Sequence, residues 1–196
     1  MKLLMFQRTI LFQKLLEVQI NSRPKMTTDK VVTGVLMLGE MLEQPKVLAD
    51  SIKLWDQDIS AICSILPEKI QGVVFIGRGS SDNAATIGRY AVEAFTGIPA
   101  SLAAPSLSTR YAPHTSYVDY VIVAMSQSGG TPEVIAAASA LKGKGSKIIA
   151  ITNSVDSSLA RIADLHIDLQ AGVEKAVPAT KTVTAQVLAV LKIASA

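Results

Sequence analysis

Short apolar runs alternate with longer segments of mixed polarity from about residue 67 to the end of the chain. A strand buried on both faces of a parallel sheet has a continuous apolar sequence rather than an alternating one. Such strands, separated by helices, are typical of repeated βαβ units. The pattern predicts an α/β fold, a three-layer αβα sandwich around a mainly parallel five-stranded sheet. The runs occupy residues 72–76, 98–103, 120–125, 147–152 and 164–169.

Helix signals fill the segments between these runs. Gly97 and Pro99 mark the end of the first helix, because glycine accepts a left-handed cap and proline cannot continue a helix. Pro132 suits the first position of the second helix. The final predicted helix has no stop signal before Ala196. We expect helices over residues 81–95, 131–141, 157–162 and from about 179 onward.

A helical pattern also covers residues 30–66, with an interruption at Gln44 and Pro45. Proline has no amide hydrogen to donate, and it disfavours helical backbone in the residue before it. We therefore expect one helix before Pro45 and a second helix after it. Trp55 is interpreted as a packing anchor, with stacking on a ligand as the alternative. Cys63 has apolar neighbours and is interpreted as a packed core thiol rather than a nucleophile.

The charge distribution argues against a nucleic-acid partner. The chain carries 19 Lys and Arg residues and 16 Asp and Glu residues, a formal net charge of +3. Residues 1–25 contain five of the basic residues and one of the acidic ones, or +4, which leaves 14 basic and 15 acidic residues, or −1, in residues 26–196. The globular part therefore has no domain-wide positive field to attract a polyanion.

Composition indicates a globular protein and is compatible with a reducing compartment. Apolar residues make up 49% of the chain and charged residues 18%, which allows a sizeable core. The single cysteine cannot form a disulfide within the chain, which is compatible with the cytoplasm. No uninterrupted apolar run approaches the roughly 18 residues of a membrane-spanning helix. We therefore expect a cytoplasmic protein without a membrane partner.

Three parts are expected along the chain. Residues 1–25 are interpreted as an N-terminal extension from a mis-assigned start, because Met26 directly precedes a helix-start pattern. The alternative is an amphipathic targeting or membrane-surface helix, since apolar residues recur there at helical spacing. Residues 26–66 are predicted to form N-terminal helices, and residues 67–196 the α/β domain.

The first candidate site is the glycine-rich turn after the strand predicted for residues 72–76. In an open parallel sheet, ligands bind outside the carboxyl ends of the strands. Ser80 and Ser81 place hydroxyl groups at the N-terminus of the following helix, which favours a phosphate group. A dinucleotide fingerprint would need glycine where Asp82 stands. The alternative hypothesis is that Ser81 or Asp82 serves only as a helix cap.

The second candidate site is the turn over residues 126–131. Ser126, Ser128 and Thr131 offer hydroxyl groups in this turn. Gln127 adds an amide donor. Neutral donors and a helix dipole can hold a phosphate dianion without Lys or Arg. Because a plain strand-to-helix turn needs only one cap residue, we predict that this turn binds phosphate.

A long loop over residues 171–181 is the third place of interest. Glu174 in this loop is either a catalytic base or a solvated charge, and the solvated charge is the favoured interpretation. His166 lies in an apolar strand pattern and is interpreted as structural, whereas the role of His114 stays open. No His, Cys or acidic residues have the spacing of metal ligands. We expect no metal and no cofactor.

These three places together resemble the SIS (sugar isomerase) domain family. The resemblance extends from about Met37 to Ala196, in particular to the isomerase half of glutamine:fructose-6-phosphate amidotransferase and to glucosamine-6-phosphate deaminases. It is specific because several motifs occur in the right order and spacing. The motifs are Leu42-Glu-Gln-Pro45, Gly77-Arg-Gly-Ser-Ser81, Ser126-Gln-Ser-Gly129, Ala150-Ile-Thr-Asn153, Ser158-Leu-Ala-Arg161, Ala171-Gly-x-Glu174 and Ala179-Thr-Lys-Thr182.

The resemblance implies that the chain binds a hexose 6-phosphate or an amino-sugar phosphate. Ser80 would face the sugar, and Val177 would offer its backbone to the substrate. The family often has a serine where Ala179 stands in the sugar site, so one polar contact is missing. Glu174 matches a family position but is not assigned as the base, and the catalytic residue stays unidentified. The implied phosphate ligands are Ser81, Ser126, Gln127, Ser128 and Thr131.

Two departures from the family pattern bear on activity. Nothing in this chain corresponds to the N-terminal cysteine of the amidotransferase's glutaminase domain, so we expect no glutamine-dependent amide transfer. The family takes its enolisation base, a nearby lysine and a ring-opening histidine from a second SIS domain or a neighbouring subunit. The chain stops within the helix after the first domain, so we expect a truncated piece of an aldose–ketose isomerase or deaminase that pairs as a homodimer.

Two other hypotheses remain beside the enzyme. One is a non-catalytic module that senses sugar phosphates, since SIS domains also occur in regulators. The other is an inactive gene fragment with no independent role.

Overall fold

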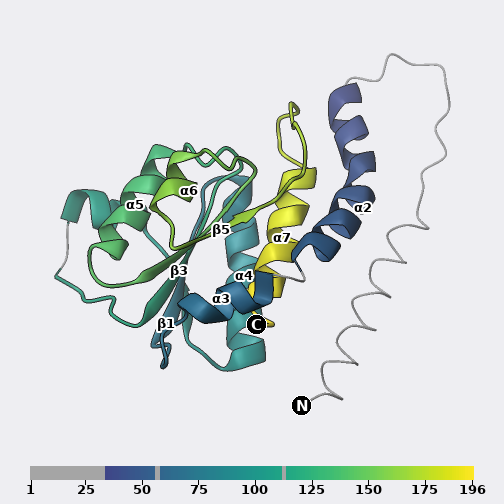
Figure 1. Ribbon diagram of the computed structural model, residues 1–196. Coiled ribbons are helices and arrows are strands. Elements are labelled where there is room, and N and C mark those ends of the chain that lie inside the picture. The colour runs from purple at the N-terminus through teal and green to yellow at the C-terminus, as the bar shows by residue number, and fades with distance from the viewer. Residues whose placement is uncertain (1–33, 56–57, 112–113) are drawn as a thin grey trace, which may run out of the picture. The chain divides into compact units, whose positions relative to one another are not determined.

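The structure is a computed structural model that describes residues 34–55, 58–111 and 114–196 (Figure 1). The chain divides into two units, Met1–Val35 and Leu36–Ala196, and the architecture is that of the second unit. The predicted extension over residues 1–25, and its alternative as an amphipathic helix, lie outside the described residues.

Five short strands form one sheet. Their order across the sheet is β2-β1-β3-β4-β5, and every neighbouring pair is parallel. The predicted five-stranded sheet is therefore confirmed, and it is parallel throughout. β1, β3 and β4 are almost wholly buried, as their continuous apolar sequences predict. The strands are β1 (Gly72–Ile76), β2 (Ala100–Leu102), β3 (Tyr120–Met125), β4 (Lys147–Thr152) and β5 (Leu165–Asp168).

Helices cover both faces of this sheet (Figure 1). On one face, α4 (Ser80–Thr96) packs against α7 (Lys181–Ile193). On the other face lie α5 (Pro132–Lys142) and α6 (Ser158–Ile162). A short π-helical turn, η1 (Leu107–Tyr111), packs beside α5. The three-layer αβα sandwich predicted from the sequence is confirmed.

Alternate strand residues fill the two cores of the sandwich. Val74 of β1 and Ile122 of β3 belong to the cluster that α5 and α6 cover. Phe75 points to the opposite face, where Gly88 of α4 leaves room for its ring and Val190 of α7 packs alongside. Burial of apolar surface on both sides is the main stabilising contribution to such a sheet. The central strands β1 and β3 therefore give firm support to the turns at their carboxyl ends.

One helix, α2 (Val35–Trp55), runs through Pro45 without a break. The prediction of two helices divided at Gln44 and Pro45 is therefore wrong. Pro45 cannot donate the bond that an α-helix would direct at the carbonyl of Met41, four residues earlier. The side-chain amide of Gln44 donates to that carbonyl at 3.2 Å and satisfies it. The next helix, α3, spans Asp58–Ile65.

Trp55 and Cys63 behave differently from each other. Trp55 is 2% exposed, and its Nε1 donates to the carbonyl oxygen of Asp168 at 3.0 Å, so it is the packing anchor that was predicted. Cys63 is exposed, and the prediction of a packed core thiol is wrong. α3 buries Ile62, and the next residue on a helix points about 100° away. Apolar neighbours in sequence thus did not bring the thiol into the core.

The other helix ends follow their local signals. Gly97 closes α4 in the left-handed conformation, with φ 72°, and Pro132 begins α5. α7 ends at Ile193, earlier than expected, and the amide of Ala194 still bonds the carbonyl of Val190 at 3.0 Å. Among the described helices, none has both the length and the apolar character needed to cross a membrane.

Candidate functional site

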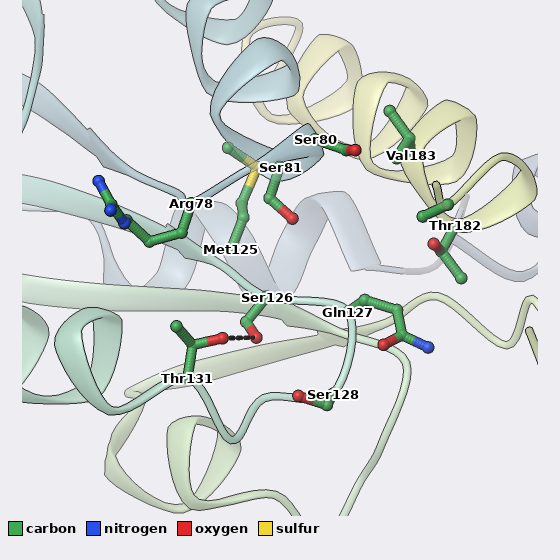
Figure 2. A pocket seen from close by; sticks show the side chains of 11 residues that line it. Arg78, Ser80, Ser81, Met125, Ser126, Gln127, Ser128, Thr131, Thr182 and Val183 are labelled. Atoms are coloured by element: carbon green, nitrogen blue, oxygen red, sulfur yellow. Dashed lines mark hydrogen bonds between the residues drawn. The ribbon is translucent and has the colours of Figure 1, made fainter. Parts of the chain in front are cut away.

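A cavity opens at the carboxyl ends of the adjacent strands β1 and β3. The chain proceeds from β1 to β2 at one edge of the sheet and from β3 to β4 and β5 toward the other edge. Such a divergence is where open α/β sheets bind ligands. The cavity has a volume of about 210 Å³, and Figure 2 shows the side chains around it. It is lined by Arg78, Ser80, Ser81, Met125, Ser126, Gln127, Ser128, Thr131, Ala179, Thr182 and Val183.

The cavity brings together seven of the eight residues predicted to bind the sugar phosphate. All five predicted phosphate ligands line it, together with Ser80 and Ala179. Val177 is not among the lining residues, and 94% of its surface is exposed. The three predicted places, far apart in sequence, therefore meet at one end of the sheet.

The turn between β1 and α4 presents Ser80 and Ser81 without a conventional helix cap. The N-cap position is Gly79, with φ 57°, and it has no side chain to bond the first amide groups. The hypothesis that Ser81 or Asp82 is only a helix cap does not fit this geometry. Ser81 is buried at the start of α4, and its hydroxyl faces the cavity (Figure 2).

The turn between β3 and α5 is closed by its own hydroxyl groups. Ser126 Oγ lies 2.9 Å from Thr131 Oγ1, and it also accepts a bond from the amide of Gly129 at 3.1 Å. Ser128 Oγ accepts from the amide of Gly130 at 3.2 Å. Thr131 occupies the N-cap of α5 but makes no cap bond with its side chain. Its hydroxyl group is thus directed at the cavity side of the turn (Figure 2).

Glycine is required at position 129 for two reasons. Its φ is 62°, a conformation that other residues adopt only with strain. A Cβ atom there would also lie 2.2 Å from Ser157 Oγ. The turn is fastened to the segment after β4, because the amide of Asn153 donates to Gln127 at 2.9 Å and that of Leu159 to Gly129 at 3.0 Å.

Glu174 organises the loop before α7 and does not line the cavity. Its carboxylate accepts from the amide of Thr180 at 2.8 Å and from the hydroxyl of Thr182. It also accepts from the amide of Thr182 at 3.4 Å. An acid at the N-terminus of a helix interacts favourably with the helix dipole. These contacts give Glu174 a role in holding the loop rather than in solvation at the surface.

The N-terminal ends of three helices reach the cavity lining. Ser80 and Ser81 begin α4, Thr131 is the N-cap of α5, and Thr182 and Val183 lie in the first turn of α7. The free amide groups and aligned peptide dipoles of helix N-termini attract anions. Arg78 is the one charged residue among the described lining residues. In Figure 2 its guanidinium group points away from the hydroxyl groups of Ser126 and Thr131. An anion in this cavity would therefore meet mostly hydroxyl groups and amide dipoles.

The sequence patterns do not single out four of the lining residues. Arg78 lies between the two glycines of the first turn, and this position was the signal that could have identified it. Met125 ends β3 directly before the second turn. Thr182 and Val183 belong to the first turn of α7, which only the folded chain brings to the ends of β1 and β3.

His166 has a structural partner. Its Nε2 lies 2.8 Å from Thr152 Oγ1, and that hydroxyl donates its single proton to the carbonyl of Ser154 at 2.8 Å, so His166 must donate from Nε2. Burial lowers the pKa of His166 from the usual 6.5, although the charge of Asp168 opposes this shift. The structural role predicted for His166 agrees with these contacts. Within the described ranges, no group of His, Cys, Asp and Glu could hold a metal ion.

Comparison with known proteins identifies the domain. The family model described as the SIS domain matches residues 68–196, more than half of the chain. The chain belongs to the SIS domain family. This SIS domain is 35% identical over 158 residues to the glutamine–fructose-6-phosphate aminotransferase of Gloeobacter violaceus, a match that covers 78% of this chain and 26% of that protein.

Two solved structures share this SIS fold. A protein of Silicibacter pomeroyi, named as a phosphosugar isomerase, superposes with a TM-score of 0.76 at 29% identity, over 81% of this chain and 49% of that one. Glucosamine-6-phosphate deaminase of Thermotoga maritima gives a TM-score of 0.64 at 25% identity, over 81% and 48%. The predicted likeness to both the aminotransferase and the deaminase is confirmed. The chain spans about a quarter of the length of the curated relatives that it matches.

Proposed function

We propose that this SIS domain binds the phosphate group of a hexose 6-phosphate or an amino-sugar phosphate. The observation that carries the proposal is the convergence of hydroxyl side chains and three helix N-termini on one cavity at the ends of β1 and β3. Such donors suit a phosphate dianion, because they bond its oxygens without a competing buried charge. The phosphate ligands in this proposal are Ser81, Ser126, Gln127, Ser128 and Thr131.

The sugar would extend from the phosphate toward the start of α7. Ser80 and Ala179 line that side of the cavity and would face the sugar. The backbone of Val177 would reach the substrate only if the loop before α7 moved, because Val177 does not line the cavity. Thr182 also lines the cavity near Ala179, where the family often has a serine, but its hydroxyl group already donates to Glu174.

For the whole protein we infer aldose–ketose isomerisation of a sugar phosphate, with or without loss of ammonia. This chemistry needs a base beside C1 and C2 and an acid that opens the ring. The described lining residues include no His, Asp, Glu or Cys. This domain would therefore anchor the substrate, and the base and acid would come from a second SIS domain or from a second copy of the chain in a cytoplasmic homodimer.

Titration calorimetry tests the binding proposal directly. The chain is titrated with glucosamine 6-phosphate and fructose 6-phosphate, and in parallel with glucosamine, fructose and inorganic phosphate. We expect saturable heat with the two sugar phosphates and none with the unphosphorylated sugars, because the phosphate supplies the charge that the helix termini attract. Absence of heat with both sugar phosphates at millimolar concentration, for a chain shown to be folded, would refute the proposal.

A pair of serine variants locates the site. Ser128→Ala removes a hydroxyl group from the cavity lining and should weaken binding. Ser64→Ala is the matched control, since Ser64 Oγ donates to the carbonyl of Ala61 within α3 and does not line the cavity. Equal affinities of the two variants would place the ligand elsewhere.

A further inference from the structure

Helix α2 lies before the part of the chain that the SIS family model matches, yet it contacts the segment that leads into the cavity. Trp55 Nε1 donates to the carbonyl of Asp168 at 3.0 Å, at the end of β5. One turn earlier, Ser51 Oγ donates to the carbonyl of Leu169 at 3.4 Å. The C-terminal half of α2 thus fixes the point where the loop from β5 to α7 begins.

The N-terminal half of α2 holds the middle of the same loop through Glu40. Glu40 is 7% exposed, and its carboxylate accepts from two successive amides, those of Lys175 at 2.5 Å and Ala176 at 3.1 Å. A buried carboxylate is costly unless hydrogen bonds compensate for the lost water. Bonds to a charged acceptor are also the stronger kind. Each partner therefore fixes the position of the other.

A second acid of α2 holds the end of the loop. Glu43 pairs with Lys181 Nζ at 2.5 Å, and the Lys181 side chain is 3% exposed. Lys181 is the first residue of α7, and its neighbours in the chain include Thr182, which lines the cavity. Ala179, also in the lining, lies between the two points that α2 holds.

We propose that Glu40 and Glu43 are positioning residues of the sugar-phosphate site, an inference that rests on the proposed function. They touch no part of the cavity themselves. They hold the loop over residues 171–181 so that Ala179 and Thr182 are in place before the ligand arrives. A loop that is ordered before binding gives a higher affinity for the ligand, because no conformational entropy of the loop is lost on binding. α2 is thus a functional part of the domain.

The test compares Glu40→Ala and Glu40→Gln with a substitution of another acid that also accepts a hydrogen bond from a backbone amide. Asp164 accepts from the amide of Ile148 at 2.7 Å and lies at the opposite end of the sheet from the cavity, which makes Asp164→Ala the matched control. For each full-length variant we measure urea unfolding, amide hydrogen exchange over residues 171–180, and calorimetric affinity for glucosamine 6-phosphate. Exchange is measured without ligand, so it does not depend on the proposed function.

Glu40→Ala should speed amide exchange over residues 171–180 and raise the Kd for glucosamine 6-phosphate about tenfold. Glu40→Gln keeps an acceptor oxygen and should restore part of the affinity. Asp164→Ala should lower stability while leaving loop exchange and Kd as in the parent chain. Glu43→Gln changes a half-exposed acid and serves as the second variant if Glu40→Ala does not fold. It should likewise speed loop exchange and raise the Kd.

The outcomes separate the two proposals. Unchanged exchange and unchanged Kd in the Glu40 and Glu43 variants overturn the positioning role. Tighter binding by Glu40→Gln than by the parent chain also overturns it, since the carboxylate would then act only by repelling the phosphate. A parent chain that binds no sugar phosphate refutes the proposed function instead, and the exchange data still show whether Glu40 holds the loop.

Discussion

The hydroxyl groups of Ser126 and Thr131 lie 2.9 Å apart and close the turn between β3 and α5. Thr131 stands at the N-cap of α5, where a threonine side chain would ordinarily bond the first amides of the helix, but it makes no such bond. Both side chains line the cavity. The pair therefore presents two hydroxyl groups to the cavity at the N-terminus of α5.

Thr131→Val tests whether this pair takes part in binding. Valine has nearly the same shape but no hydroxyl group, so the turn loses one donor to a charged ligand. Hydrogen bonds to charged groups contribute about 1.5–3 kcal/mol, so the Kd for glucosamine 6-phosphate should rise by about tenfold to a hundredfold. Thr86→Val is the calorimetric control, because Thr86 Oγ1 bonds Asp82 O within α4 and does not line the cavity. Equal Kd values for both variants would contradict the assignment.

Gly129→Ala should destabilise the domain. The residue has a φ of 62°, and an added Cβ would lie 2.2 Å from Ser157 Oγ. Backbone strain and overpacking at such a position each cost about 1–3 kcal/mol in the free energy of unfolding. Urea denaturation measures the change.

Gly143→Ala is the control for this substitution. Gly143 has a φ of −60°, and its nearest neighbours lie 3.6 Å from an added Cβ. Alanine there should be neutral or stabilise the folded state by up to about 1 kcal/mol, because it restricts the unfolded chain. If Gly143→Ala lowered the free energy of unfolding as much as Gly129→Ala does, strain at position 129 would not explain the destabilisation by Gly129→Ala.

Local signals in the sequence predicted the central strands almost to the residue. β3 and β4 are continuous apolar runs with polar or small residues at both ends, so their limits coincide with the predicted ones. The helix through Pro45 escaped prediction because a side-chain bond from Gln44 offsets the missing amide. The exposure of Cys63 was not predicted, because the orientation of a short helix depends on its packing in the folded chain. The residues next to Cys63 in sequence carry no information on that orientation.

The site was predictable in its chemistry and not in its assembly. Ligands of open parallel sheets bind at the carboxyl ends of the strands, which is why residues 77–81 and 126–131 were chosen as candidate sites. That both turns serve one phosphate group was implied by the resemblance to the SIS family. That β1 and β3 are direct neighbours follows from the strand order, which no local pattern reports. The contact of Glu40 with the amide of Lys175 joins positions 135 residues apart, and only the folded chain reveals it.

Arg78→Gln tests the single charged side chain of the described cavity lining. An exposed charge contributes up to about 1 kcal/mol, so the Kd for glucosamine 6-phosphate should rise by about threefold. Salt screens exposed charges, so the difference from the parent chain should shrink as ionic strength rises. Arg89→Gln removes a charge that pairs with Glu93 on α4, outside the lining, and should leave Kd unchanged. A salt-independent difference would mean that Arg78 acts by contact or shape rather than by its charge.

His166→Gln should reduce the loss of stability in mild acid. Burial lowers the pKa of His166 in the folded chain below the usual 6.5. Well above that value the imidazole is neutral in both states and adds no pH dependence. As the pH falls through the ordinary pKa of 6.5, the histidine takes up a proton in the unfolded chain before it does so in the folded chain. The free energy of unfolding therefore decreases. The variant lacks this proton, and its stability should fall less steeply.

Urea unfolding from about pH 7.5 to about pH 5.5 measures this slope, because the window spans the ordinary pKa of a histidine. His114→Gln is the matched control, because it makes the same substitution at an exposed position. Glutamine in His166→Gln replaces the hydrogen bond from His166 Nε2 to Thr152 only imperfectly. The variant should therefore be less stable than the parent chain at every pH. That offset does not alter the comparison of slopes. Parallel stability curves for the parent chain and His166→Gln would contradict a lowered pKa at this position.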